Sequence, residues 1–83
     1  MKGKEKMPQY NGYASWNAWN VALWIRNDEA LYRLALLCLR QHRRAGGRHA
    51  AALTFLQLAG TDATPDGAPW RLSTVYAAME GLS

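Results

Sequence analysis

The chain has 83 residues, of which 49% are hydrophobic, and a formal net charge of +4. A chain of this length forms one domain with a modest core, and its single cysteine excludes an internal disulfide and suits a reducing compartment. The start lacks the apolar segment of a signal peptide, and the longest apolar run, residues 34–39, is too short to span a bilayer. We therefore expect a cytoplasmic protein without membrane association.

The first residues differ in composition from the rest of the chain. Residues 1–9 are polar and basic, and we expect them to form a flexible N-terminal arm. A single helical domain is expected over residues 10–83. At its start, Asn11-Gly12 is a turn signal between two tyrosines, and we expect this loop to pack back on the helices.

A first helix is predicted over residues 16–27, because Ser15 is a favourable N-cap directly before an apolar periodic segment. The apolar arc of this helix holds Trp16, Ala18, Trp19, Val21, Ala22, Leu23 and Ile25, and Trp16, Trp19 and Leu23 share one face of it. We expect that face to form part of the core.

Residues 28–44 predict the helix around which the other segments are organised. Asp28 is its expected N-cap. The charged side chains lie on one narrow stripe, formed by Glu29, Arg33, Arg40 and Arg44. Nearly all other positions are apolar, and a helix that is apolar over most of its circumference must be covered on several sides. We therefore expect a mostly buried central helix at about 28–44.

Two shorter helices complete the predicted fold. Gly46-Gly47 ends the central helix, and a third helix follows over 48–59, with Gly60 as its expected C-cap. After a loop rich in turn residues, a fourth helix is expected over about 69–80, docked by one narrow apolar face. Because no segment has a strand pattern, the sequence predicts an all-α fold, a compact four-helix single domain.

The residue types do not favour catalysis. Cys38 and His42 are four residues apart on one helix, and His49 follows the glycine turn, but a zinc site needs about four ligands at characteristic spacing. The chain contains no carboxylate pair, glycine-rich phosphate loop or nucleophile motif. We expect Cys38 to be a small core residue and the protein to be no enzyme, with no cofactor and no metal.

The arginines are the more informative group. Residues 31–60 contain no acidic side chain but five arginines, namely Arg33, Arg40, Arg43, Arg44 and Arg48. Such a patch favours an acidic partner, either nucleic acid or an acidic protein surface. The alternative interpretation is a solvated stripe on a buried helix. Base reading by a helix-turn-helix is disfavoured, because the helix after the turn offers only Ala, Thr and Gln to a groove.

A second candidate surface combines an aromatic ring with amides. Trp24 shares a sector of the first helix with Asn17 and Asn20. If this sector faces solvent, Trp24 and Asn17 are typical of a protein-binding hot spot. The alternative is that a neighbouring loop, with residues 10–13 as the expected cover, lies over them while Asn20 bonds buried backbone groups.

Two segments carry a resemblance to a known group of proteins. They read WNVALWI at residues 19–25 and NDEALY at residues 27–32, with Tyr10-Asn11-Gly12 before them and Pro69-Trp70-Arg71 after them. This pattern resembles a family of small phage and mobile-element proteins, largely of unknown function, with a W-N-V-x-L-W-(I/L)-x-N-D-E-x-L-Y signature. Departures from that pattern are Ala18, where polar residues are usual, and the arginine-rich turn at 40–48.

The resemblance implies a target in host defence, because small phage proteins without catalytic groups often bind and block defence complexes. We expect an anti-CRISPR protein that blocks a host CRISPR-Cas subunit, or another defence protein, in the host cell cytosol. The expected partner-binding residues are Arg33, Arg40, Arg43, Arg44, Arg48, Trp24 and Asn17. The alternatives are a basic nucleic-acid-binding accessory protein and a phage adaptor protein.

Overall fold

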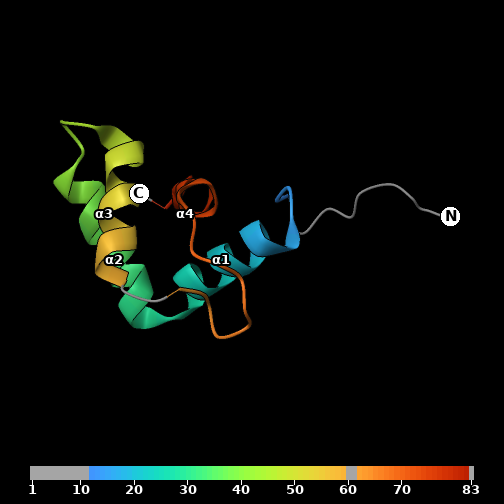
Figure 1. Cartoon of the computed structure of the whole chain (residues 1–83). Helices are drawn as coiled ribbons and strands as arrows, with labels where there is room; N and C mark the ends of the chain where they lie inside the picture. Colours follow the sequence, from blue (N-terminus) through green and yellow to red (C-terminus); the bar gives the residue numbers. More distant parts are fainter. Residues whose placement is uncertain (1–11, 60–61, 83) are drawn as a thin grey trace, which may run out of the picture.

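The computed structural model describes residues 12–59 and 62–82 (Figure 1). It contains four α-helices, namely α1 (Trp16–Asn27), α2 (Glu29–Gln41), α3 (Gly47–Ala59) and α4 (Leu72–Met79). The only β pairing within these residues is an isolated antiparallel bridge between Ala63 and Pro69. The predicted all-α four-helix domain is therefore confirmed. The predicted arm at 1–9 and the predicted Gly60 cap lie outside the described residues.

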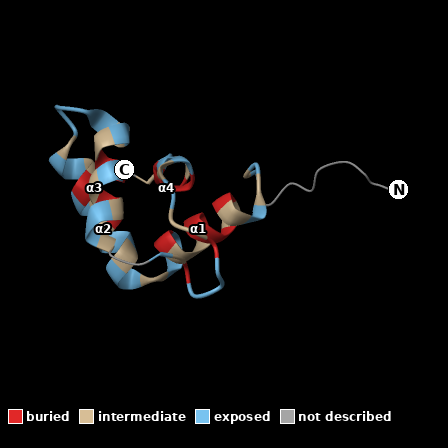
Figure 2. Ribbon diagram, in the orientation of Figure 1, coloured by how far each residue is buried: buried red, intermediate tan, exposed pale blue. Residues whose placement is uncertain are grey.

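The helices form a ring around the core. Helices α2 and α3 lie side by side as a hairpin, and α4, seen end-on in Figure 1, lies between α3 and α1. Substantial contacts join α1 to α2, α2 to α3, α3 to α4 and α4 to α1. Figure 2 shows the buried residues on the inward sides of these helices. The largest fully buried side chains are Phe55, Ile25, Met79, Val21, Val75, Asn20 and Cys38.

Asp28 forms the corner between the first two helices. Its backbone N–H donates to the carbonyl of Trp24 (3.0 Å) and closes α1, and its carboxylate accepts from the N–H of Leu31 (3.0 Å) and caps α2. At the other end of α1, the Ser15 hydroxyl accepts from the N–H of Ala18 (3.1 Å). Both predicted N-caps are confirmed, because capping depends on residues only three positions apart.

The prediction of a mostly buried central helix at 28–44 is wrong. Helix α2 ends at Gln41, and only Ala35 and Cys38 are buried along it. Leu37 is 53% exposed. In a ring of four helices each helix packs against two neighbours. Each helix therefore buries one inward face, and its outward face meets solvent even where that face carries apolar residues. Helix α2 is thus an amphipathic member of the ring.

Helix α1 is rotated relative to the predicted core face. Trp16 is 38% exposed and Trp19 and Leu23 are half-buried, whereas Asn20 is buried. The buried side of α1 is formed by Ala18, Asn20, Val21, Ala22 and Ile25. Four residues of the predicted apolar arc are therefore buried, but its Trp16, Trp19 and Leu23 face is not the most buried one, because a polar loop covers Asn20.

That loop, residues 62–70, is closed on itself and clamped to α1. The N–H of Thr64 donates to the carbonyl of Ala68 (2.8 Å), and the N–H of Ala68 donates to the Thr64 hydroxyl (3.0 Å). The Thr64 hydroxyl in turn donates to Oδ1 of Asn20 (2.6 Å), while Nδ2 of Asn20 donates to Oδ2 of Asp66 (2.9 Å). The indole N–H of Trp24 donates to the same Asp66 oxygen (3.0 Å). We call this network the Asn20 clamp.

The clamp leads directly into α4, which begins at Leu72 and not at the predicted residue 69. Pro69 lies in the bridge with Ala63, so the chain is still extended there. Arg71 precedes the helix and its N–H donates to the Thr74 hydroxyl (3.3 Å). Helix α4 packs against both α1 and α3 through one face, which is formed by Thr74, Val75, Ala78 and Met79. None of the helices in the described part of the chain has the length and apolarity to cross a membrane.

The buried Asn20 side chain gives a test of the clamp. Asn20→Ala removes the partners of Thr64 and Asp66, and we expect a loss of about 1–3 kcal/mol in the free energy of unfolding. This corresponds to a fall in Tm of at least about 4 °C for a domain of this size. Asn17→Ala on the same helix is the matched control and is expected to change Tm little. Thermal unfolding followed by circular dichroism measures both, and equal effects of the two variants would contradict the clamp.

The clamp also predicts a pH dependence. Hydrogen bonds from Asn20 and then from Trp24 hold the pKa of the Asp66 carboxyl below its ordinary value. Because the pKa is lower in the folded state, this stabilisation is present above about pH 4 and is lost as the pH falls through the folded pKa. We expect Asp66→Asn to lower Tm at pH 7, and the difference in Tm from the parent protein to shrink below about pH 4. A difference that is constant with pH would show that the carboxylate charge has no part in the clamp.

Candidate binding surface at the α2–α3 turn

The turn between α2 and α3 is rigidly closed. The N–H of His42 donates to the carbonyl of Cys38 (3.1 Å), and the N–H of Gly47 donates to the carbonyl of His42 (3.0 Å). The His42 ring lies 2.9 Å from the Thr54 hydroxyl on α3, so it joins the two helices. Gly46 has φ +84°, and a Cβ there would lie 2.5 Å from the Cβ of Ala50. Only glycine fits this position, which fixes the path of the turn.

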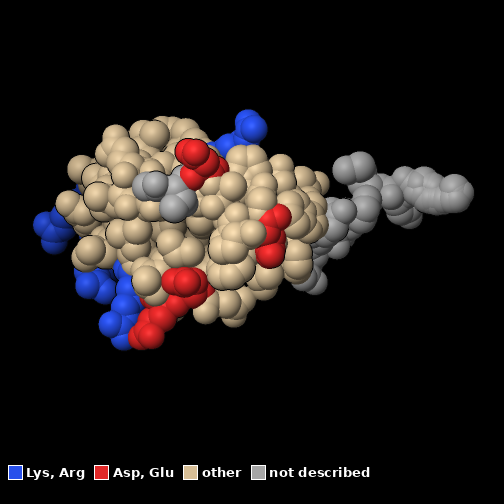
Figure 3. Space-filling model, turned by 60° about the horizontal axis from the view of Figure 1, so that its bottom comes forward, with Lys and Arg blue, Asp and Glu red and all other residues tan. Residues whose placement is uncertain are grey.

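Three exposed arginines surround this turn. Arg40 lies in the last turn of α2, and Arg43 and Arg44 lie in the connection to α3. We call these three residues the arginine turn. Within residues 12–59 and 62–82 none of them pairs with a carboxylate. Figure 3 shows Lys and Arg atoms at the left edge, the side to which α2 and α3 contribute.

Arg33 does not belong to this group. Its guanidinium pairs with Glu29 at 2.6 Å, and both side chains are 75% exposed. Such an exposed pair contributes little to stability. Arg33 also lies seven residues, or about 10 Å along the helix, before Arg40. The residues of the predicted stripe are therefore exposed. Their charge is balanced at the Glu29–Arg33 end and unbalanced at the Arg40–Arg44 end.

Arg48 faces another direction, toward α4. Its guanidinium carbon lies 4.2 Å from the centroid of the Tyr76 ring, which is a cation–π contact. Its Nε atom is buried and has no hydrogen-bond partner among the described residues. Stacking on the ring holds this long side chain in one orientation, so less entropy is lost when it binds an anion.

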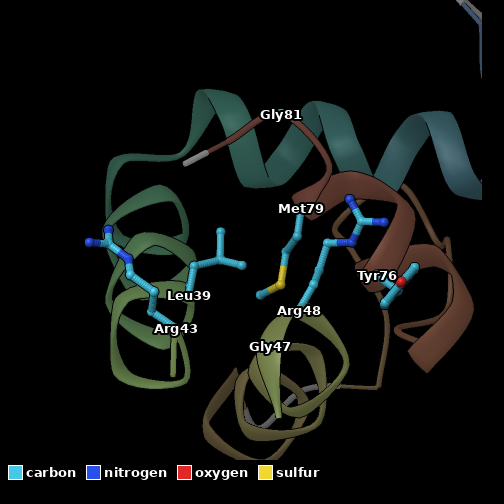
Figure 4. Close-up of a pocket in the computed structure, with 7 residues that line it drawn as sticks. All are labelled: Leu39, Arg43, Gly47, Arg48, Tyr76, Met79 and Gly81. Atoms are coloured by element: carbon cyan, nitrogen blue, oxygen red, sulfur yellow. The ribbon is translucent and has the colours of Figure 1, made fainter. Parts of the chain in front are cut away.

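A surface groove of about 360 Å³ lies between these elements. Figure 4 shows Leu39 and Met79 side chains projecting into it, Arg48 rising between Met79 and Tyr76, and the Arg43 guanidinium at the opposite side, directed away from Arg48. Met79 is 1% exposed and forms the apolar floor. We call this hollow the cationic groove. Sequence reasoning missed the contributions of Tyr76 and Met79, because they approach α3 only through the placement of α4.

Trp24 and Asn17 lie apart from the arginine turn. The loop at residues 62–68, below α1 in Figure 1, contacts Trp24 through Asp66, whereas the α2–α3 turn is at the upper left. The expected cover at 10–13 lies partly outside the described residues, and Tyr13 at its end lines a separate hollow with Trp19. Asn20 bonds side chains of the loop and not the predicted backbone groups. A role of Trp24 and Asn17 in partner binding stays a prediction.

The thiol of Cys38 and the rings of His42 and His49 take part in the packing and contacts of the fold. Cys38 is fully buried, and burial raises the pKa of its thiol. His42 is bonded to Thr54, and His49 contacts the edge of the Tyr76 ring at a centroid distance of 6.5 Å. Over the described ranges, no group of three or more His, Cys, Asp or Glu side chains is placed to hold a metal ion.

The fold and this surface define a small all-α domain that presents a rigid, arginine-bearing turn. The model of a family of unknown function, DUF7249, matches residues 6–82, and the chain belongs to this family. No curated protein and no solved structure matches it. The resemblance to phage and mobile-element proteins remains a prediction.

The buried thiol gives a simple test of the packing around α2. We expect Cys38 to react with a thiol-specific disulfide reagent at pH 8 roughly two orders of magnitude more slowly in the native protein than in urea, because reaction requires local opening and the thiolate is disfavoured. Absorbance of the released thiol measures the rate. Equal rates in both conditions would mean that α2 does not bury this residue.

Proposed function

We propose that this protein is a non-catalytic inhibitor that docks its arginine turn on an acidic surface of a host defence complex and blocks that complex sterically. An anti-CRISPR protein acting on a CRISPR-Cas subunit in the host cytosol is the leading form of this proposal. The defence target is supported by the resemblance of residues 19–32 to small phage proteins. The mode of action is supported by the surface itself.

The observation that carries the proposal is the unbalanced charge of Arg40, Arg43 and Arg44. Their guanidinium groups are exposed and without carboxylate partners in the described chain, on a turn whose backbone is fixed by hydrogen bonds. A guanidinium group offers a planar fork of donors that pairs with a carboxylate through two hydrogen bonds. A rigid turn with three such groups is suited to an acidic protein surface and accelerates encounter with it.

Nucleic acid is the second candidate partner. The same three guanidinium groups can bind backbone phosphates, because such binding does not depend on one exact spacing of the side chains. Any such binding would follow the backbone only. The outward residues of α3 include Leu53 and Gln57, and Leu53 is 43% exposed, so this helix offers a largely apolar face to a groove. A protein partner therefore fits the described surface better.

Phage plating tests the proposal. The protein is expressed in hosts that each carry one active CRISPR-Cas type with a spacer against the infecting phage. We expect plaque formation to be restored in one of them. The charge-reversed variant Arg40→Glu, Arg43→Glu and Arg44→Glu is expected to lose this effect while its helical circular dichroism spectrum persists. Arg33→Gln is the matched control on the same helix and is expected to stay active, because its exposed pair contributes little.

If plaques are restored with none of the CRISPR-Cas types, the anti-CRISPR form of the proposal is rejected. If the triple variant stays active, the arginine turn is not the docking surface. A salt series with random duplex DNA separates the second candidate. Three phosphate contacts predict that log K falls with log salt with a slope of about −2.7, whereas a protein-directed turn predicts no measurable binding at low salt.

A further inference from the structure

Tyr76 forms a ridge between two hollows. On one side is the cationic groove, and on the other is a second hollow of about 500 Å³ that is lined by His49, Leu72, Ser73 and Tyr76. Tyr76 itself is 38% exposed. One aromatic ring is thus shared by a basic recess and a mainly apolar one.

Two residues at the start of α3 contact the Tyr76 ring. Arg48 lies over the face of the Tyr76 ring, with 4.2 Å from its guanidinium carbon to the ring centroid, and His49 meets the ring edge at 6.5 Å. Consecutive residues of α3 therefore flank Tyr76, one on the side of each hollow. Because both contacts come from the helix, the ridge is preorganised and binding would need little ordering of side chains.

The cationic groove has no acidic lining residue. Arg43 and Arg48 line it together with Leu39 and Met79, and the nearest acid along the chain, Glu80, lines a different hollow near Ser15. The Arg48 guanidinium is therefore uncompensated within the groove, whereas the Arg43 guanidinium at the rim is directed away from it (Figure 4). An anionic group that enters here gains charge-assisted hydrogen bonds above an apolar floor.

We propose that these two hollows bind a protein segment in which an acidic side chain stands next to an apolar one. The carboxylate enters the cationic groove beside Arg48, and the apolar side chain covers Leu72 and the free side of Tyr76. The two hollows define which side chains the partner presents. That the partner belongs to a host defence complex rests on the proposed function. A phosphate backbone fits less well, because it would fill the groove and leave the adjacent apolar hollow uncovered.

A blocked tetrapeptide is the probe, with acetyl and amide ends and the sequence Gly-Asp-Leu-Gly. Binding is measured from backbone amide shifts in a two-dimensional NMR titration of the whole protein. We expect shifts around Arg48, Ser73 and Tyr76 together. Peptides with Asn in place of Asp, or Gly in place of Leu, are each expected to bind roughly tenfold more weakly, since each loses one of the two contacts.

Variants locate the site. Arg48→Gln and Tyr76→Ala are each expected to weaken binding of the Gly-Asp-Leu-Gly peptide roughly tenfold. Arg33→Gln, which removes an arginine that is paired with Glu29 and lies outside both hollows, is the matched control and is expected to bind as the parent does. The amide spectrum reports whether each variant is folded, and Tyr76→Leu removes the aromatic ring while keeping apolar volume and helix propensity if Tyr76→Ala unfolds.

Equal binding of the three peptides would overturn the inference. Inorganic phosphate that binds as tightly as the acidic peptide would also overturn it and would make the groove a phosphate site. Because this titration uses purified protein and no host component, its failure beside restored plaque formation rejects the segment and leaves the proposed function standing. Peptide binding without restored plaques rejects the defence target and retains the site.

Discussion

The rest of the structure depends on the hydrogen bonds that Asn20 makes with Thr64 and Asp66. These bonds join residues 44 and 46 positions apart in the chain, in a domain that has no disulfide to do so. A buried primary amide must satisfy both its oxygen and its nitrogen, and the closed loop offers one donor and one acceptor in the required places. The clamp is therefore specific as well as stabilising, because few other loop conformations would satisfy the amide.

The consequence of the clamp is the position of α4. The loop at 62–70 ends directly before this helix, so fixing the loop on α1 sets α4 between α1 and α3. In this position Val75, Ala78 and Met79 of α4 are buried in the core. Trp70 packs edge-on against Phe55, with 5.7 Å between the ring centroids. The same placement brings Tyr76 against Arg48. The surface with the most distinctive chemistry is thus formed by the packing that completes the core.

Charge is distributed unevenly over this frame. Asp28, Glu29 and Asp66 lie at the α1–α2 corner and on the clamped loop, whereas the arginine turn lies at the other end of α2. Figure 3 shows several basic groups at the left edge, with carboxylates beside the lowest of them, and further carboxylates toward the middle of the view. An approaching acidic surface is therefore oriented before contact, with the arginine turn foremost.

The sequence by itself determined the helices and their caps. Ser15 and Asp28 begin α1 and α2 as predicted, and the bounds of α1 and α3 agree with prediction to within one residue, because capping and periodicity act over three or four positions. It also placed the charged stripe of α2 on the surface. The burial of Asn20 and the exposure of Trp16 on α1 were decided only by the tertiary structure. So were the loop that covers Trp24, the amphipathic place of α2 in a ring, and the meeting of Arg48 with Tyr76. These features depend on contacts between residues tens of positions apart, and neither composition nor helical period contains the orientation of one helix relative to another.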